Sequence, residues 1–148
     1  MSLREQITAD MKEAMRARDT IRLEAVRLLR AAIQRREVDG QIELVDDEVL
    51  SVIQKMIKQG RDSIEQFEKG GRQDLVEKER AMLAVLEPYL PDALSEEDLA
   101  ALIATAMIDT SAESIRDMGQ VMGWLKPKLQ GRADMATVSA AVREQLNR

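Results

Sequence analysis

Apolar residues recur at helical spacing along most of this chain, and that periodicity restricts the possible folds more than any other feature. Near the start, the apolar stripe consists of Leu3, Ile7, Met11 and Ala14. Residues three or four apart share one face of an α-helix, whereas strands alternate every second residue. Alternating runs of Val or Ile are few, and the helix formers Ala, Leu, Glu, Arg and Met dominate. The sequence therefore predicts an all-α fold.

Capping residues and glycines divide this pattern into separate helices. The expected boundaries in the first part of the chain are an end near Arg18, a cap at Asp19 or Thr20, a break over residues 38–41, a start at Asp46 or Asp47, and an end at Gly70-Gly71. A fourth helix is expected from about Arg72 to Glu87. The second helix should contact neighbours on two sides, because its apolar positions cover a broad arc: Ile21, Ala25, Leu28, Leu29 and Ala32.

Two prolines mark the middle of the chain, in the junction Glu87-Pro88-Tyr89-Leu90-Pro91-Asp92. Prolines stop helices and often lie between domains. The sequence predicts an N-terminal helical hairpin bundle over residues 1–91 and a smaller C-terminal helical domain over residues 92–148. Ser95, Ser114 and Asp134 are the expected helix caps of the second domain. Pro127 cannot donate to the Gly123 carbonyl, so the helix around it is expected to kink or restart.

The residue types that are missing exclude several kinds of chemistry. The chain has no histidine and no cysteine, so it lacks the commonest general base, the common zinc ligands and a thiol nucleophile. We therefore predict no catalytic residue, no metal site and no cofactor. The first five residues lack an apolar signal core, and the longest apolar run, residues 99–108, lies between two aspartates. No membrane span is expected, and the predicted location is cytoplasmic.

Two charged residues fall on apolar helix faces. Glu79 lies among the apolar positions of the fourth helix, and Arg22 lies within the apolar arc of the second. Our hypothesis is that each is partly buried and paired with an opposite charge, fixing the register of its helix rather than serving catalysis.

The segment from Ser114 to Gly123 has too many glycines for an ordinary amphipathic helix. Gly119 and Gly123 are four residues apart and would share one helical face, where a missing side chain admits another backbone or a phosphate. One interpretation is a phosphate site formed by this face, Lys126 and the start of the last helix after Arg132. The other is tight helix packing. Trp124 could stack on a base, although packing against the rest of the protein is the favoured interpretation.

Charge supports a local rather than a general contact with nucleic acid. The whole chain has a net charge of −5, which is not typical of a basic nucleic-acid binder. From residue 116 onward the balance reverses, because only Asp117, Asp134 and Glu144 oppose the basic residues Arg116, Lys126, Lys128, Arg132, Arg143 and Arg148. An N-terminal arginine series is interspersed with acidic residues and indicates a solvated helix face rather than an RNA track: Arg16, Arg18, Arg22, Arg27, Arg30, Arg35 and Arg36.

Two motifs resemble the YqeY family: Asp117-Met118-Gly119-Gln120-Val121-Met122-Gly123 and Gly131-Arg132-Ala133-Asp134. The resemblance extends over the whole chain, through Tyr89-Leu90-Pro91 and the helix that includes Asp74-Leu75 and Glu79. More distantly, the chain is similar to the C-terminal tail domain of GatB, a subunit of the tRNA-dependent amidotransferases. The resemblance implies an all-helical protein that assists tRNA handling without catalysis of its own. It places the tRNA-binding positions at Gly119, Gly123, Lys126, Lys128, Gly131 and Arg132.

Three classes of function stay open at this point. The first is an accessory tRNA-binding module connected with glutamine-dependent amidation of tRNA, for which the family-level label is a carbon–nitrogen ligase with glutamine as amide donor. The second is an adaptor that docks its glycine-marked helix on an aminoacyl-tRNA synthetase or an amidotransferase subunit. The third is an unrecognised enzyme, against which the missing histidine and cysteine argue.

Overall fold

The computed structural model describes residues 2–147. Over that range the chain forms seven α-helices, two short 3₁₀ helices and no strand, which confirms the all-α prediction. By its internal contacts the chain divides into two compact units, one ending at Leu90 and the other beginning at Pro91. None of the helices described is long and apolar enough to cross a membrane.

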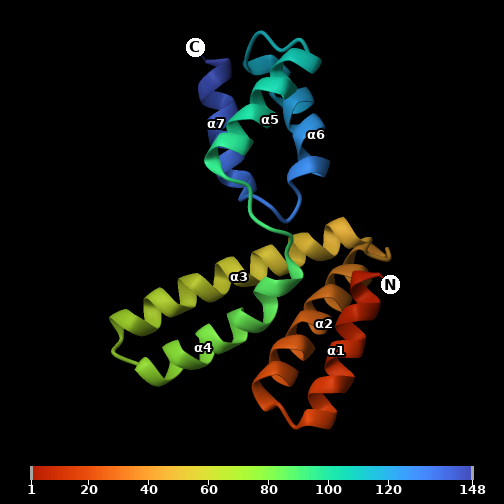
Figure 1. Ribbon diagram of the computed structural model, residues 1–148, viewed down its shortest axis with the longest axis vertical. Coiled ribbons are helices and arrows are strands. Elements are labelled where there is room, and N and C mark those ends of the chain that lie inside the picture. The colour runs from red at the N-terminus through yellow and green to blue at the C-terminus, as the bar shows by residue number, and fades with distance from the viewer. Residues whose placement is uncertain (1, 148) are drawn as a thin grey trace. The chain divides into compact units, whose positions relative to one another are not determined.

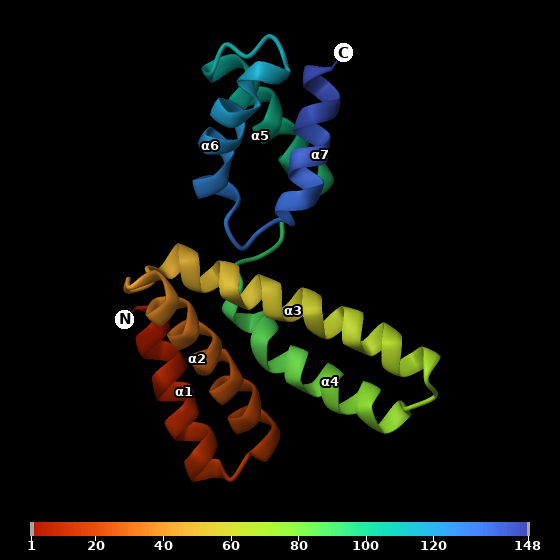
Figure 2. The same ribbon diagram turned by 180° about the vertical axis from the view of Figure 1, so that it is seen from behind.

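The N-terminal unit consists of two helical hairpins (Figure 1). Its elements are α1 (Leu3–Ala17), α2 (Thr20–Gly40), α3 (Asp46–Lys69), α4 (Gln73–Leu86) and the 3₁₀ helix η1 (Glu87–Tyr89). Seen from both sides, α1 runs beside α2, and α3 runs beside α4 (Figure 2). The core between the hairpins is aliphatic and includes Ile7, Val26, Leu29, Ile53 and Leu83.

Local capping explains most of the helix boundaries in this unit. The Asp19 carboxylate accepts a hydrogen bond from the Arg22 backbone N–H at 3.2 Å, which confirms the predicted cap of α2. The predicted break over residues 38–41 is confirmed, because α2 ends at Gly40 and is capped by Gln41, whose φ is +52°.

The apolar arc of α2 is narrower than the sequence predicts. This helix contacts α1, α3 and α4, which confirms the expectation of neighbours on two sides. Val26, Leu29 and Ile33 are buried, whereas Leu28 is 49% exposed and Ile21 39% exposed. Only part of the predicted apolar arc is therefore covered by neighbouring helices, and Leu28 and Ile21 lie on the part that is not.

Gly60 marks the contact between α3 and α4. It is buried, and a Cβ atom built there would lie 2.5 Å from Leu83 Cδ2 and 3.2 Å from Leu83 Cγ. Such distances leave no room for a side chain, so α4 packs directly on the bare backbone of α3.

The C-terminal unit is a bundle of three α-helices. Its elements are α5 (Glu96–Asp109), the 3₁₀ helix η2 (Ile115–Asp117), α6 (Met118–Leu129) and α7 (Met135–Leu146). Ser95 accepts a hydrogen bond from the Asp98 N–H at 3.1 Å and caps α5, as predicted. The fully enclosed residues of the core are Ile103, Ala106, Val121, Leu125, Leu129, Val138 and Val142.

The helix does not restart at Pro127, as one of the two expected outcomes required, because Pro127 lies inside the single helix α6. The proline removes one hydrogen bond, to the carbonyl of Gly123. That loss falls in the last turn of the helix, and Gly123 is exposed, so water can satisfy the carbonyl. Buried Leu125 and Leu129 on either side keep the turn in place.

Ser114 caps η2, which leads directly into α6. The Ser114 hydroxyl accepts from Arg116 N–H, and the Asp117 carboxylate accepts from the N–H groups of Glu113 at 2.8 Å and Ser114 at 3.2 Å. These two bonds, with Glu113 the larger contributor, hold the pKa of Asp117 below its ordinary value of 3.8.

The Asp117 cap makes the stability of this unit depend on pH. A carboxyl whose pKa is lowered by folding stabilises the folded state above its ordinary pKa, and this contribution is lost as the pH falls through the lowered value. We expect Asp117→Asn to flatten the decline in unfolding free energy between pH 5 and pH 2. The measurement is urea unfolding monitored by fluorescence of Trp124, the single tryptophan. Parallel pH profiles for the two proteins would contradict the assignment.

Candidate nucleic-acid interface

The exposed face of α6 carries two glycines that nothing in the structure requires. Gly119 and Gly123 are both exposed, and a Cβ atom added at either would meet no heavy atom within 4 Å. They are one turn apart, so they form a continuous bare strip of helix backbone. Within the C-terminal unit, therefore, no helix packs against Gly119 or Gly123, whereas α4 packs against Gly60 in the N-terminal unit.

The structure separates the two lysines of α6. Lys126 follows Gly119 by seven residues, two turns of helix, and is exposed on the same face. Lys128 follows by nine residues, or two and a half turns, and lies on the opposite flank. There its ammonium nitrogen is 3.9 Å from the centre of the Trp124 ring. Trp124 itself packs against the core of this unit, which confirms the favoured packing role.

Gly131 has a structural explanation of its own. It is buried and has a φ of +78°. The preceding Gln130 has φ −58° and ψ 120°, and Arg132 N–H donates to the Leu129 carbonyl at 2.9 Å. These values define a type II turn, whose third position favours glycine. A buried turn residue offers little surface to a ligand.

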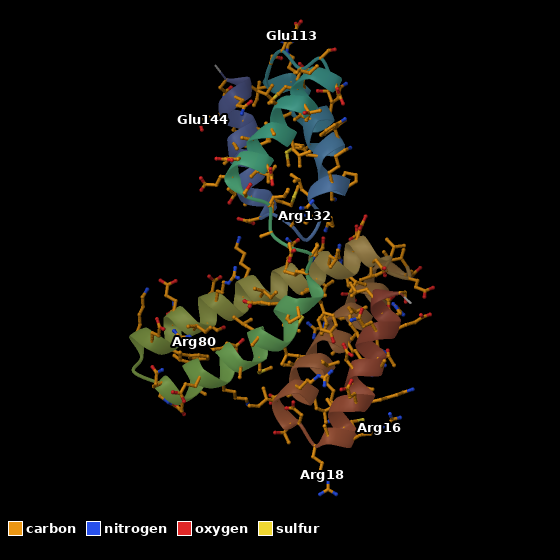
Figure 3. All side chains as sticks on the ribbon, in the orientation of Figure 1. Arg16, Arg18, Arg80, Glu113, Arg132 and Glu144 are labelled. Carbon is orange, nitrogen blue, oxygen red and sulfur yellow. The ribbon has the colours of Figure 1, made fainter. Side chains whose placement is uncertain are left out.

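Arg132 joins this turn to the segment that precedes α5. Its Nε–H donates to the Asp92 carbonyl at 3.1 Å, and its own carbonyl accepts from Leu94 N–H at 3.1 Å. Figure 3 shows Arg132 at the turn between α6 and α7. Arg132 is half-buried, and one N–H donor of its guanidinium group is used in a hydrogen bond within the unit.

The N-terminus of α7 already holds an anion supplied by the chain itself. The Asp134 carboxylate accepts from Ala136 N–H at 3.4 Å and from the Thr137 hydroxyl at 2.9 Å. Asp134 is thus the predicted helix cap, and it occupies the place where the sequence suggested a phosphate. Of the six positions predicted to meet tRNA, the structure brings together Gly119, Gly123 and Lys126. Arg148, counted among the basic residues, lies outside the described range.

The hypothesis for Arg22 is confirmed, and it belongs to a network that the sequence did not reveal. The side chain of Arg22 is 29% exposed and pairs with Asp10 at 3.6 Å and Glu13 at 3.5 Å. A hydrogen bond to Glu13, and then the charges of Glu13 and Asp10, raise its pKa. The Tyr89 hydroxyl donates to Asp10, and burial followed by this bond raises the pKa of Tyr89. The network ties η1 to α1 and α2.

The structure supports the predicted partial burial of Glu79 but not the predicted ion pair. Glu79 is partly buried, and its Oε1 lies 3.0 Å from the position that a Cβ of Gly60 would take. None of the ion pairs found among residues 2–147 includes it. Its carboxylate instead lies at the edge of the contact between α3 and α4.

Comparison with known proteins identifies the family. The family model described as Yqey-like protein matches residues 4–146. A protein of Pyrenophora tritici-repentis named Altered inheritance of mitochondria protein 41, mitochondrial, is 34% identical over 94% of this chain and 78% of its own length. Proteins of the same name from Kluyveromyces lactis and Lachancea thermotolerans are 33% and 29% identical, over 94% and 92% of this chain and 79% and 76% of their own lengths.

These relatives are named as mitochondrial proteins, and this finding contradicts the predicted cytoplasmic location. The prediction failed because it used the lack of an apolar signal core and of a membrane span, and neither feature identifies a compartment. The family match covers nearly the whole described chain, including both units and the glycine-marked helix α6. This chain belongs to the YqeY family.

Proposed function

We propose that this chain is an accessory tRNA-binding module related to the glutamine-dependent tRNA amidotransferases, and that it adds affinity for tRNA without making bonds itself. The observation that carries the proposal is the open face of α6, where Gly119 and Gly123 leave the backbone bare beside Lys126. A phosphate or ribose can approach peptide groups closely where Cβ atoms are missing. The neighbouring lysine supplies the positive charge that most phosphate contacts use.

The distribution of charge within the C-terminal unit supports a contact at α6. This helix contains two lysines and no carboxylate. The neighbouring helix α5 contains Glu96, Glu97, Asp98 and Asp109 and no basic residue. An acidic surface repels a polyanion, so a strand of RNA would meet this unit on the α6 side.

Salt-dependent binding of tRNA tests the proposal. We expect total tRNA to bind the wild-type protein in fluorescence anisotropy, with an affinity that falls as salt rises. Changing Lys126 to glutamate should reduce the slope of log K against log salt by about 1, as expected for the loss of one phosphate contact. Arg143→Glu, the matched change on α7, should leave the slope nearly unchanged.

A second pair of variants separates shape from charge. Leucine at positions 119 and 123 fills the bare strip without altering net charge, and we expect it to weaken tRNA binding about tenfold or more. A Cβ atom at either position meets no heavy atom within 4 Å, and far-ultraviolet circular dichroism checks that the leucine variant is folded. Absence of tRNA binding at low salt, or full binding by the leucine variant, would overturn the proposal.

The same bare strip favours one second candidate, an adaptor that docks a partner helix. Small residues four apart let two helix backbones approach closely, and both glycines face open space. The partner would be an aminoacyl-tRNA synthetase or an amidotransferase subunit. Capture of such a partner that survives RNase and high salt, and is abolished in the leucine variant, would favour the adaptor over tRNA binding.

A further inference from the structure

The long helix α2 carries arginines that the fold leaves without ion-pair partners. Arg4, Arg22 and Arg36 of the same unit pair with carboxylates. Among the residues that the structure describes, Arg27 and Arg30 have no carboxylate within the 4.0 Å that defines a salt bridge. Both are exposed. Their guanidinium groups are therefore available to an anion that comes from outside the chain.

These two arginines line a cleft between α1 and α2 with a volume of about 440 Å³. Thr8 and Gln34 also line it, together with Ile7 and Ile33, which are 1% and 5% exposed. The volume lies within the range of about 300–1,000 Å³ that is usual for small-molecule sites. The cleft thus offers a ligand mainly guanidinium, hydroxyl and amide groups.

The cleft has a net positive charge, and its one carboxylate, Glu37, already has partners within the protein. Glu37 pairs with Arg4 and also accepts a hydrogen bond from Leu44 N–H at 2.8 Å. Three arginines and one glutamate line the cleft, which leaves an excess of two positive charges. An anionic ligand would thus meet no unpaired carboxylate on the walls.

Arg30 also contacts α1 through Met11, a residue outside the lining of the cleft. Its Nη1 lies 2.9 Å from Met11 Sδ and donates from α2 to α1. A thioether is a weak acceptor, and a guanidinium has five N–H donors. This contact therefore orients the group and leaves its other donors for a stronger acceptor.

We propose that this cleft binds a nucleotide, with a phosphate between Arg27 and Arg30 and the nucleoside beside the Thr8 hydroxyl and the Gln34 amide. Guanidinium forks match phosphate oxygens in pairs, and two of them on one rim suit a group with several acceptor oxygens. The volume of the cleft accommodates a body larger than a simple anion. The nucleotide can be free or can belong to an RNA strand, because both present the same phosphate chemistry. The inference concerns the N-terminal unit and does not rest on the contact proposed for α6.

Calorimetry with defined probes tests this site. We expect ATP to bind the full-length protein, and inorganic phosphate and adenosine, tested separately, to bind at least tenfold more weakly. Arg27→Gln with Arg30→Gln should weaken ATP binding by tenfold or more. Arg16→Gln with Arg18→Gln is the matched control, since these arginines lie at the end of α1, away from the cleft (Figure 3). That control should bind ATP as the wild type does.

A 5′-phosphorylated RNA trinucleotide distinguishes the two sources of the nucleotide. If only ATP binds, the site is assigned to a free nucleotide. If only the trinucleotide binds, the site is assigned to an RNA end. Either assignment requires that the double variant Arg27→Gln with Arg30→Gln abolishes the binding. Far-ultraviolet circular dichroism checks that the variants are folded. Failure of both probes to bind at low salt, or equal losses in the two double variants, would overturn the proposal.

Discussion

Replacing Gly60 with valine is expected to lower the free energy of unfolding of the N-terminal unit by about 3 kcal/mol. A Cβ atom at this position would lie 2.5 Å from Leu83 Cδ2 and 3.0 Å from Glu79 Oε1. Valine adds two further methyl groups, so the buried Leu83 side chain must leave its position or α4 must move away from α3, and either change disrupts the core. Urea unfolding followed by circular dichroism measures the change, and hydrogen exchange of the amides of α3 and α4 locates it.

A double-mutant cycle shows whether Leu83 causes that effect. Gly60→Ala alone is expected to destabilise, because the clash with Leu83 exceeds the gain of about 1 kcal/mol that alanine brings to a helix. In a Leu83→Ala background the clashing atoms are gone, so the same change should become neutral or stabilising. An equal effect of Gly60→Ala in both backgrounds would show that steric contact with Leu83 is not the cause.

Changing both Gly119 and Gly123 to alanine is expected to raise the free energy of unfolding of the C-terminal unit by about 2 kcal/mol. Both positions are helical, exposed and open, and an added Cβ meets no atom within 4 Å. Alanine restricts the unfolded chain without straining the folded one. Urea unfolding monitored by Trp124 fluorescence gives the change. The alanine pair is therefore expected to be a more stable protein that binds its ligand less well.

Gly131 supplies the control for that measurement within the same unit. Its φ of +78° disfavours any residue with a Cβ, so Gly131→Ala should destabilise by about 1 kcal/mol or more. A loss of stability in the variant with alanine at 119 and 123 would mean that these glycines already contact something in the folded protein, and would remove the basis for an open binding face.

Local signals predicted most of the helices because their causes are local. Asp19, Ser95 and Asp134 cap the helices that they were expected to cap, since a cap needs only the next few residues. The expected restart at Pro127 did not occur, because buried Leu125 and Leu129 on either side keep the proline within one helix. Sequence alone does not show what a segment packs against.

The candidate sites depend on contacts that periodicity does not describe. Gly60 and Gly119 both interrupt amphipathic helices, yet one faces Leu83 and the other faces open space. Arg22 could be singled out because it falls within an apolar arc. Its partner network could not, because Tyr89 and Asp10 are far apart in sequence. Arg27 and Arg30 in the α1–α2 cleft lack a carboxylate partner. In the sequence they belong to a mixed-charge helix face, and only the structure distinguishes them from arginines that form ion pairs.

The hydrogen bond between Tyr89 and Asp10 spans 79 positions of the chain, and this separation has a consequence during synthesis. Ribosomes add about 5–20 residues per second, so several seconds pass between the addition of Asp10 and that of Tyr89. The hairpin of α1 and α2 is complete in sequence early in that interval, but the network around Arg22 cannot close until η1 has emerged. A nascent chain halted before residue 89 should therefore leave the carboxylate of Asp10 without its tyrosine donor and expose the first hairpin to chaperones.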